Sequence, residues 1–243
     1  MSEENEIVNC HEKENIKFSQ VATDESQLNS NCEVPNPLAI LPPDSDEVSN
    51  SNSIDSKDET AFNYLQNEWS LWFCKRDSSR DWTESLHLIE HFNTVEDFWR
   101  LIDHITPPFA LPTGCDYYLF RRDIKPMWEH NTNRCGGSWQ VTFKNSTRSL
   151  LLNRFWENLT MLLVGEGCGS DSEIVCGGVV NVRKMTDRLC LWVSNYEDKQ
   201  QIMRIGRHIK RILEIDFPIE FYPHIDVVKN ALYSGRGRPL LEL

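Results

Sequence analysis

The stretch LHLIEHFNTVEDFWRLIDHITPP, residues 86–108, shows a strand, the start of a helix and the end of that helix in direct succession. Residues 86–92 are rich in the apolar and aromatic types that strands favour. Thr94 then matches a helix N-cap, with Asp97 three residues on in a near capping box. Pro107 and Pro108 cannot continue a helix. The stretch therefore predicts a strand that leads directly into a helix ending before Pro107.

The apolar residues of this helix fall into two groups. The spacing of one group predicts a stripe facing the core, made of Phe98, Leu101, Ile102 and Ile105. Val95 and Trp99 are spaced i, i+4 and so lie together on another side of the helix. The pattern leaves two interpretations open for this pair, a wider core stripe or a surface patch.

Similar patterns continue outward from this stretch on both sides. Further strands are predicted at 69–75, 117–121, 139–143, 174–183 and 189–194, and further helices at about 150–164 and 199–214. Pairs of strands separated by single helices, on an irregular rhythm, indicate an α+β fold whose mostly antiparallel sheet has helices on one face. The other face is then free for a ligand.

The composition of the chain changes near residue 60. Residues 1–60 contain no Trp or Tyr and carry 14 acidic and 3 basic side chains, a net charge of −11, whereas the rest carries 23 acidic and 22 basic, a net of −1. We expect a disordered acidic tail at 1–60, because it lacks the apolar surface that offsets chain ordering, and one folded domain at 61–243.

The near-neutral charge of the folded part limits its ligands. General nucleic-acid binding depends on many Lys and Arg contacts to phosphate, so a nucleic-acid ligand of this domain must be held by a few specific contacts.

The sequence predicts a cytoplasmic protein. The N-terminus is acidic and has no apolar signal region, and no run of about 18 apolar residues occurs. The eight cysteines show no CxxC spacing and are expected to be free thiols.

Two motifs suggest enzyme chemistry but stand in the wrong context. His87, Glu90 and His91 match a zinc-protease signature that requires a helix, whereas this stretch is predicted as a strand. The glycine-rich stretch 165–169 follows a helix instead of opening one, unlike a phosphate-binding loop. No nucleophile, acid–base pair or metal-ligand cluster has a recognisable spacing, so we expect neither an enzyme nor a cofactor.

Two tryptophans lie in predicted loops beside charged residues. Trp82 lies between Asp81 and Thr83, and Trp128 directly precedes Glu129. A single loop Trp most often covers the core, since Trp is usually largely buried. Two of them, one beside a carboxylate, suggest a stacking site for a planar ligand.

Seven segments together resemble one known family. They are LQNEWSLWF (65–73), FNTVEDFW (92–99), GCDYYLF (114–120), PMWE (126–129), GGSW (136–139), RFW (154–156) and VVNVR (179–183). In this order they closely resemble the cap-binding translation initiation factor 4E, from about residue 63 to at least 224. The resemblance implies a curved eight-stranded antiparallel sheet with three helices on its convex face and a cap slot on the concave face.

The resemblance implies roles at the slot for four residues. Trp82 and Trp128 would stack on either side of 7-methylguanine, whose positive charge adds cation–π attraction. Glu129 would accept hydrogen bonds from the guanine N1–H and amino group, which adenine cannot provide. Trp192 would lie against the methyl group.

The cap triphosphate requires cations, and the resemblance places them at Arg183 and Arg188. Two departures from the family weaken this end: Met185 stands where the family has Lys, and Ser138 where it has Arg. Two alternatives stay open for Lys184, one residue away: it compensates for the lost Lys, or, on a strand, it points to the other face.

The resemblance also implies a partner site on the convex face. Val95, Trp99, Met161 and Gly165 match positions that receive a helix with a Tyr-x4-Leu-apolar motif from the scaffold factor 4G and from 4E-binding repressors.

Three departures alter this partner surface. Glu157 replaces a Leu, Asn158 replaces a Glu, and Asn63–Tyr64 replaces His-Pro, so the chain is expected to be a diverged paralogue. Two functions stay open: cap binding that recruits factor 4G to start translation, and a repressor that occupies caps without productive 4G binding. A cap-processing hydrolase is disfavoured for lack of an acidic or metal-binding cluster.

Overall fold

A computed structural model describes residues 62–76, 79, 82–144, 148–226 and 238–243 of the chain. These residues form one eight-stranded sheet in which every neighbouring pair is antiparallel, in the order β2-β1-β3-β5-β6-β4-β7-β8. The strands are β1 (Tyr64–Lys75), β2 (Leu86–Thr94), β3 (Cys115–Arg121), β4 (Gly137–Lys144), β5 (Val175–Asn181), β6 (Thr186–Val193), β7 (Glu220–Pro223) and β8 (Leu241–Glu242). The predicted fold class is confirmed.

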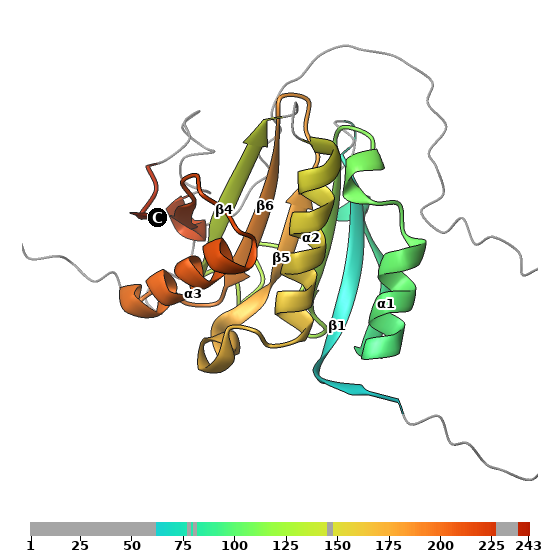
Figure 1. The fold of residues 1–243 in the computed structure, drawn as a ribbon, viewed down its shortest axis with the longest axis horizontal. Helices are drawn as coiled ribbons and strands as arrows, with labels where there is room; N and C mark the ends of the chain where they lie inside the picture. The colour runs from blue at the N-terminus through green and yellow to red at the C-terminus, as the bar shows by residue number, and fades with distance from the viewer. Residues whose placement is uncertain (1–61, 77–78, 80–81, 145–147, 227–237) are drawn as a thin grey trace, which may run out of the picture.

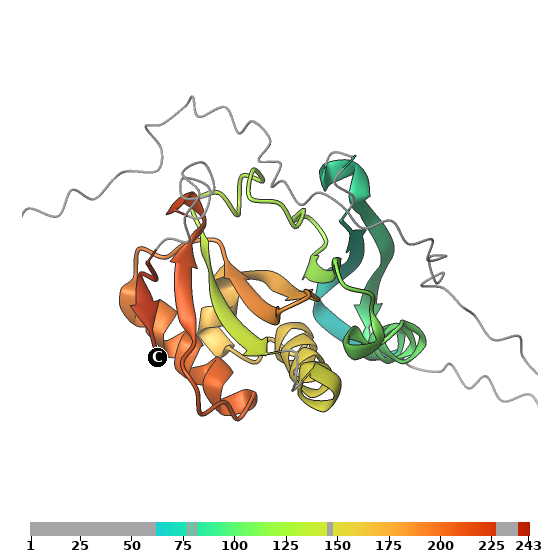
Figure 2. The ribbon, with the colours of Figure 1, turned by 90° about the horizontal axis from the view of Figure 1, so that it is seen from above.

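Three α-helices lie on one face of the curved sheet, as Figures 1 and 2 show. They are α1 (Val95–His104), α2 (Arg148–Val164) and α3 (Lys199–Ile212). Short 3-10 helices occur at η2 (Trp82–Ser85), η3 (Pro108–Ala110) and η5 (Gly169–Ile174). The main core lies between these helices and the sheet, and its fully buried members include Trp69, Leu71, Trp139, Leu159 and Ile205.

The start of α1 forms as the sequence predicts. The Thr94 hydroxyl oxygen accepts a hydrogen bond from the Asp97 backbone N–H at 3.1 Å and donates to the Asp97 carboxylate at 2.8 Å. One backbone N–H that would otherwise lack a partner at the helix start is thereby satisfied, and the second bond links the two side chains. The helix ends at His104, two residues before the predicted limit.

A second, smaller apolar cluster lies on the concave face. Alternate residues of a strand point to opposite faces, so β3 sends Tyr117 and Leu119 into the main core and Tyr118 and Phe120 into this second cluster. Strands β5 and β6 add Cys176, Val179, Cys190 and Trp192. The concave face is therefore apolar at its centre, where a stacking ligand requires it.

Element boundaries differ from prediction most at the sheet edges. Strand β1 begins at Tyr64, five residues before its predicted start, and β7 and β8 were not among the strands predicted from the pattern. Trp82, expected in a loop, opens the 3-10 helix η2 between β1 and β2. The predicted tail at 1–60 lies outside the described residues.

The prediction of free thiols holds for some cysteines but not for all. Cys74, Cys115, Cys168, Cys176 and Cys190 are free. Cys135, half-buried in the long loop between β3 and β4, is disulfide-bonded, so the prediction is wrong there. Among the described residues, no helix is long and apolar enough to cross a membrane.

Candidate functional site

Trp128 and Trp192 form the aromatic centre of the concave face. Their rings are nearly parallel, with an interplanar angle of 12° and centroids 6.5 Å apart. Trp192 is buried on β6, where Phe120 meets it edge-on at 5.4 Å. Trp128, in the loop between β3 and β4, is 37% exposed, so part of this residue is accessible. A buried ring thus supports an exposed one, as a stacking platform requires.

The structure describes the other two residues of the predicted slot to different extents. Glu129 follows it directly and is exposed, so its carboxylate is accessible to a ligand. Trp82 begins η2, after β1, but its side chain lies outside what the structure describes. The proposed sandwich of Trp82 and Trp128 therefore stays a prediction.

Arg183, the first predicted phosphate ligand, is already engaged by a carboxylate. Its guanidinium donates to both oxygens of Asp116, at 2.5 and 2.9 Å, in a two-point ion pair. Asp116 is fully buried on β3, and Arg183 retains 24% of its side-chain exposure. Burial alone would lower the pKa of Arg183, but the hydrogen bonds and charge of Asp116 outweigh it and raise the pKa above its usual value. The pairing orients the guanidinium and also neutralises part of its charge.

A second carboxylate shapes the β5–β6 hairpin that carries both predicted phosphate ligands. The buried Asp187 accepts a hydrogen bond from the Arg183 backbone N–H at 2.8 Å. Arg188 is half-buried on β6, opposite Asn181 of β5, and no ion pair joins it to another residue in the described part of the chain. Arg188 is therefore the less neutralised of the two cations.

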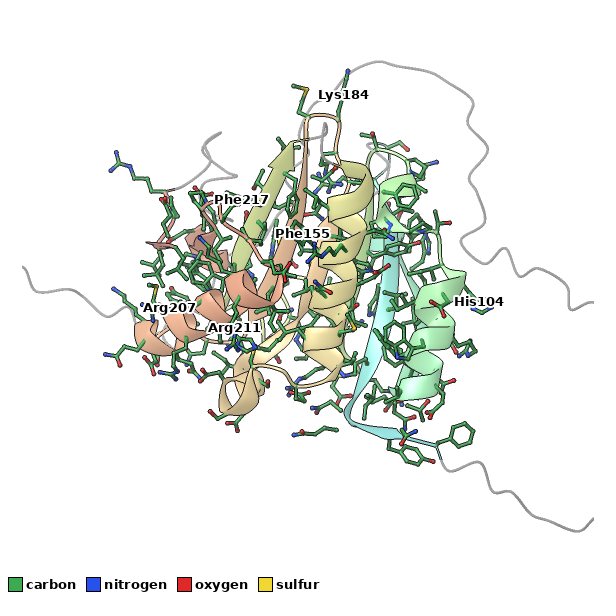
Figure 3. All side chains as sticks on the ribbon, in the orientation of Figure 1. His104, Phe155, Lys184, Arg207, Arg211 and Phe217 are labelled. Atoms are coloured by element: carbon green, nitrogen blue, oxygen red, sulfur yellow. The ribbon has the colours of Figure 1, made fainter. Side chains whose placement is uncertain are left out.

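Met185 and Ser138, the two departures from the family at the predicted phosphate end, lie in different environments. Met185 is 76% exposed at the hairpin tip, and Lys184 extends beside it away from the sheet (Figure 3). Ser138 is buried on β4 between Trp192 and Tyr222, and its hydroxyl accepts a hydrogen bond from Gln140 at 3.2 Å. Ser138 thus adds no charge to the slot.

The convex face carries an exposed apolar patch at the predicted partner positions. Val95, Trp99 and Met161 are 36%, 42% and 39% exposed, whereas Phe98 and Leu101 on the same α1 helix are buried. The interpretation of Val95 and Trp99 as a wider core stripe is therefore wrong. Gly165 directly follows α2, where a Cβ would lie 2.9 Å from the Met161 carbonyl oxygen, so a larger residue would be strained there.

Two substituted residues border this patch on α2. Glu157 is exposed and accepts a hydrogen bond from Asn153 at 3.3 Å. Asn158 is half-buried and donates to the Ile212 carbonyl oxygen at 3.5 Å, at the end of α3. Both side chains make weak contacts within the domain, which leaves them accessible to a partner.

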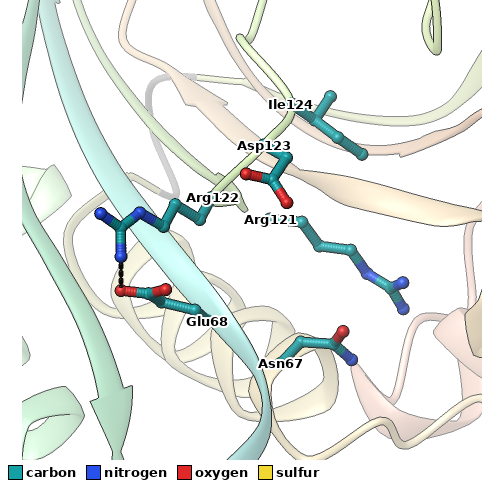
Figure 4. Close-up of a pocket in the computed structure, with 6 residues that line it drawn as sticks. All are labelled: Asn67, Glu68, Arg121, Arg122, Asp123 and Ile124. Atoms are coloured by element: carbon teal, nitrogen blue, oxygen red, sulfur yellow. Dashed lines mark hydrogen bonds and ion pairs between the residues drawn. The ribbon is translucent and has the colours of Figure 1, made fainter.

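A polar cavity of about 610 Å³ opens elsewhere, beside the end of β3 (Figure 4). Arg122 pairs with Glu68 at its rim, and Arg121 reaches inward to Glu166 at 3.1 Å. The lining consists of Asn67, Glu68, Arg121, Arg122, Asp123 and Ile124, none of which was predicted as a site residue. The cavity is a separate feature from the aromatic centre.

The sequence did not predict two buried residues that contact the candidate site, His224 and Asp116. The His224 ring packs on Trp192 with centroids 4.2 Å apart, and Asp116 pairs with Arg183. Both are buried polar residues, a rare class that marks built sites, but their partners are far away in sequence and no local pattern joins them. His87 and His91, which match a zinc-protease signature in sequence, lie on strand β2, as predicted.

Comparisons with known proteins agree with this geometry. The sequence model of the family "Eukaryotic initiation factor 4E" matches residues 64–235. Initiation factor 4E-1B of Danio rerio is 45% identical over 169 residues, which cover 69% of this chain and 79% of that protein. Initiation factor 4E of Xenopus laevis is 43% identical over 195 residues, 79% of this chain and 92% of that one.

Solved structures show the same fold. Ascaris suum eIF4E-3 with an m2,2,7G cap has a TM-score of 0.70 and 37% identity, covering 75% of this chain and 99% of that chain. Caenorhabditis elegans eIF4E-3 with the 4E-binding protein Mextli and a cap analog has a TM-score of 0.69 and 36% identity, covering 75% and 100%. The chain therefore belongs to the eukaryotic translation initiation factor 4E family, a family of cap-binding initiation factors and not of enzymes.

Proposed function

We propose that this protein binds the 7-methylguanosine cap of mRNA on its concave face and recruits the scaffold factor 4G on its convex face to start cap-dependent translation. The observation that carries the proposal is Trp128, a partly exposed ring lying parallel to a buried one beside the exposed Glu129. Trp82 and Trp128 enclose the cationic base, Glu129 reads its guanine edge, and Trp192 contacts the methyl group.

The convex site is supported by the exposed apolar patch of Val95, Trp99 and Met161. Such a patch is recognised by a helix that places a few anchors at i, i+4 and neighbouring positions, as a Tyr-x4-Leu-apolar motif does. Schistosome eIF4E has been solved with m7GpppA and a 4E-binding protein together, which is consistent with separate sites for the two ligands. A function in translation initiation places the protein in the cytoplasm.

The cap site is tested by titrating tryptophan fluorescence with 7-methyl-GTP and with GTP. Methylated nucleotide should bind far more tightly, because only the cationic base gains cation–π energy. Trp128→Ala should weaken 7-methyl-GTP binding by about 2 to 3 kcal/mol, since one aromatic face is lost. Trp99→Ala is the matched control, an equally exposed tryptophan on the opposite face, and should leave this affinity unchanged. Equal affinity for the two nucleotides would sink the proposal.

A second function is favoured by the altered convex surface. With Glu157 in place of an apolar residue and Asn158 in place of an acidic one, the partner helix loses one apolar contact and one charge partner. A chain that binds caps but recruits factor 4G poorly would act as a repressor by occupying them. Binding of a 4G motif peptide with micromolar or tighter affinity favours the initiator, and weaker binding favours the repressor.

A further inference from the structure

The loop between β3 and β4, residues 122–136, carries Trp128 and has no helix or strand of its own. A loop of this length needs internal anchors to hold one side chain in a defined place. Backbone hydrogen bonds tie its two ends to other segments, from Arg122 N–H to the Glu68 carbonyl oxygen and from His224 N–H to the Gly136 carbonyl oxygen, both at 2.9 Å. Between these ends, the described backbone hydrogen bonds stay within single turns, such as His130 N–H to the Met127 carbonyl oxygen at 3.2 Å. The anchor that spans a longer part of the loop is a side chain.

That anchor is Asn133, which is fully buried. Its side-chain nitrogen donates to the carbonyl oxygens of Lys125 and Met127, both at 2.9 Å. Met127 is the residue directly before Trp128. A carboxamide has two N–H donors, and here both are used to hold the backbone that leads into the tryptophan.

His224, directly after β7, ties Asn133 to the sheet. Its Nδ1 lies 2.8 Å from the Asn133 carbonyl oxygen, and its backbone N–H donates to the Gly136 carbonyl oxygen at 2.9 Å. Because a carbonyl oxygen can only accept, Nδ1 carries the proton. At Gly136 the loop also lies close to β6, and only glycine fits there, since a Cβ would lie 1.8 Å from the Val193 carbonyl oxygen.

The same histidine ring also touches the second tryptophan of the centre. It packs on Trp192 at 4.2 Å, and Trp192 is the ring that lies parallel to Trp128. A chain of contacts therefore joins the two tryptophans. Trp192 packs on His224, His224 is hydrogen-bonded to Asn133, and Asn133 is hydrogen-bonded to Met127, the residue before Trp128. The hydrogen bond between His224 and Asn133 is buried, and the one from Asn133 to the Met127 carbonyl oxygen is partly buried.

Packing alone does not explain why these two residues are polar. The His224 Nε2 and the Asn133 side-chain oxygen are buried and have no hydrogen-bond partner among the described residues. Buried unpartnered polar atoms cost stability, and an apolar side chain of similar shape would avoid that cost. The partnered atoms, Nδ1 of His224 and the nitrogen of Asn133, must therefore supply the benefit.

We propose that Asn133 and His224 are positioning residues that hold Trp128 at its place above Trp192 and so keep the slot preorganised for a planar ligand. The inference rests on the proposed cap site and adds the residues that set its geometry. Without the hydrogen bonds of Asn133 and His224, the loop adopts several conformations, and ligand binding must order it at a cost in affinity.

The test uses the full chain and three measurements on each variant: affinity for 7-methyl-GTP, affinity for a convex-face motif peptide, and amide hydrogen exchange in the loop. Asn133→Ala removes both donors, and His224→Phe keeps the ring but removes Nδ1–H. Each should weaken 7-methyl-GTP binding ten-fold or more and speed exchange at 127–136 at least ten-fold. Peptide affinity should stay within two-fold. Asn195→Ala, at an exposed asparagine, is the matched control and should change none of the three.

A conservative replacement separates the hydrogen bond from general damage. His224→Asn places an amide N–H near the position of Nδ1 and should recover slow loop exchange in part, whereas His224→Phe should not. Because both residues act on one path, Asn133→Ala with His224→Phe should cost no more affinity than the worse single variant.

Loop exchange unchanged in both single variants overturns the inference, as does a parallel fall in peptide affinity, which would indicate general unfolding. Failure of the proposed function looks different. If the wild-type chain does not prefer methylated nucleotide, the cap site is wrong, and loop exchange alone then decides whether Asn133 and His224 position Trp128.

Discussion

At the scale of single residues, Asp116 offsets the charge of Arg183, one of the two residues that we propose to bind the cap phosphates. It accepts from Arg183 at two points and from the Tyr118 hydroxyl at 3.2 Å, while fully buried. A buried carboxylate with this many partners fixes the direction of the guanidinium but offsets its charge. Met185 and Ser138 are uncharged, so in the proposed site Arg188 is the less neutralised of the two predicted phosphate ligands, and we expect cap affinity below that of relatives with more cations.

His224 gives a prediction at the same scale. Burial lowers its pKa to about 4 from an ordinary 6.5, and its hydrogen bond to the Asn133 backbone only partly opposes this. The unfolded chain therefore binds more protons between these values, so this residue's contribution to folding stability is complete above about pH 6.5 and is lost as the pH falls toward 4. The loss amounts to roughly 3 kcal/mol at most.

Urea unfolding at several pH values between 7 and 4.5 measures this effect. The wild-type free energy of unfolding should fall more steeply with decreasing pH than that of His224→Phe, because the carboxylates contribute equally to both. Parallel slopes for the two proteins would contradict the assignment of a buried neutral histidine.

At the scale of elements, local signals predicted most of what is seen and non-local pairing accounts for the rest. Helix α1 was predictable because Thr94, Asp97 and the spacing of Phe98 and Leu101 all act within one helix. Strand β8 was not, since its two residues become a strand only by pairing with Glu220 and Phe221 of β7. The site divides in the same way: Trp128 and Glu129 are adjacent in sequence, whereas the contacts of His224 with Asn133 and of Asp116 with Arg183 join residues far apart in sequence.

The α2 helix carries a prediction about partner choice. The double change Glu157→Leu with Asn158→Glu restores an apolar contact and an acidic partner for a motif helix, at about 1 kcal/mol each on a partly exposed surface, so 4G-peptide binding should tighten roughly ten-fold or more. The cost within the domain is small, because the two side chains hold only the weak bonds to Asn153 and Ile212.

Two measurements on that variant make the result specific. Affinity for 7-methyl-GTP should not move, because α2 and the slot lie on opposite faces of the sheet. Glu197→Leu, which adds the same apolar side chain at an exposed site after β6, should leave peptide binding unchanged. Peptide affinity that stays the same or falls in the double variant would remove the main support for a repressor.

At the scale of the whole molecule, the two candidate sites are separated by the sheet and its main core. Trp128 lies parallel to Trp192 of the concave cluster, whereas the exposed Trp99 belongs to α1, one of the helices on the convex face (Figure 1). This arrangement allows a cap and a protein partner to be bound at the same time. The described residues, which begin at 62, include the eight strands of the sheet and the three helices on its convex face, and all eight tryptophans of the chain lie after residue 60.

The last prediction concerns the segment 1–60, which contains none of the eight tryptophans. Removing residues 1–60 should leave both the melting temperature and the 7-methyl-GTP affinity nearly unchanged, with a shift in melting temperature within about 2 °C, because the segment has too little apolar surface to join the core. The deletion removes a net charge of −11, so affinities should be compared at physiological salt, where exposed charges are screened. Melting should be measured with a reducing agent present, so that the disulfide of Cys135 contributes to neither protein. A large fall in melting temperature on truncation would mean that the acidic segment packs against the domain and is not a disordered tail.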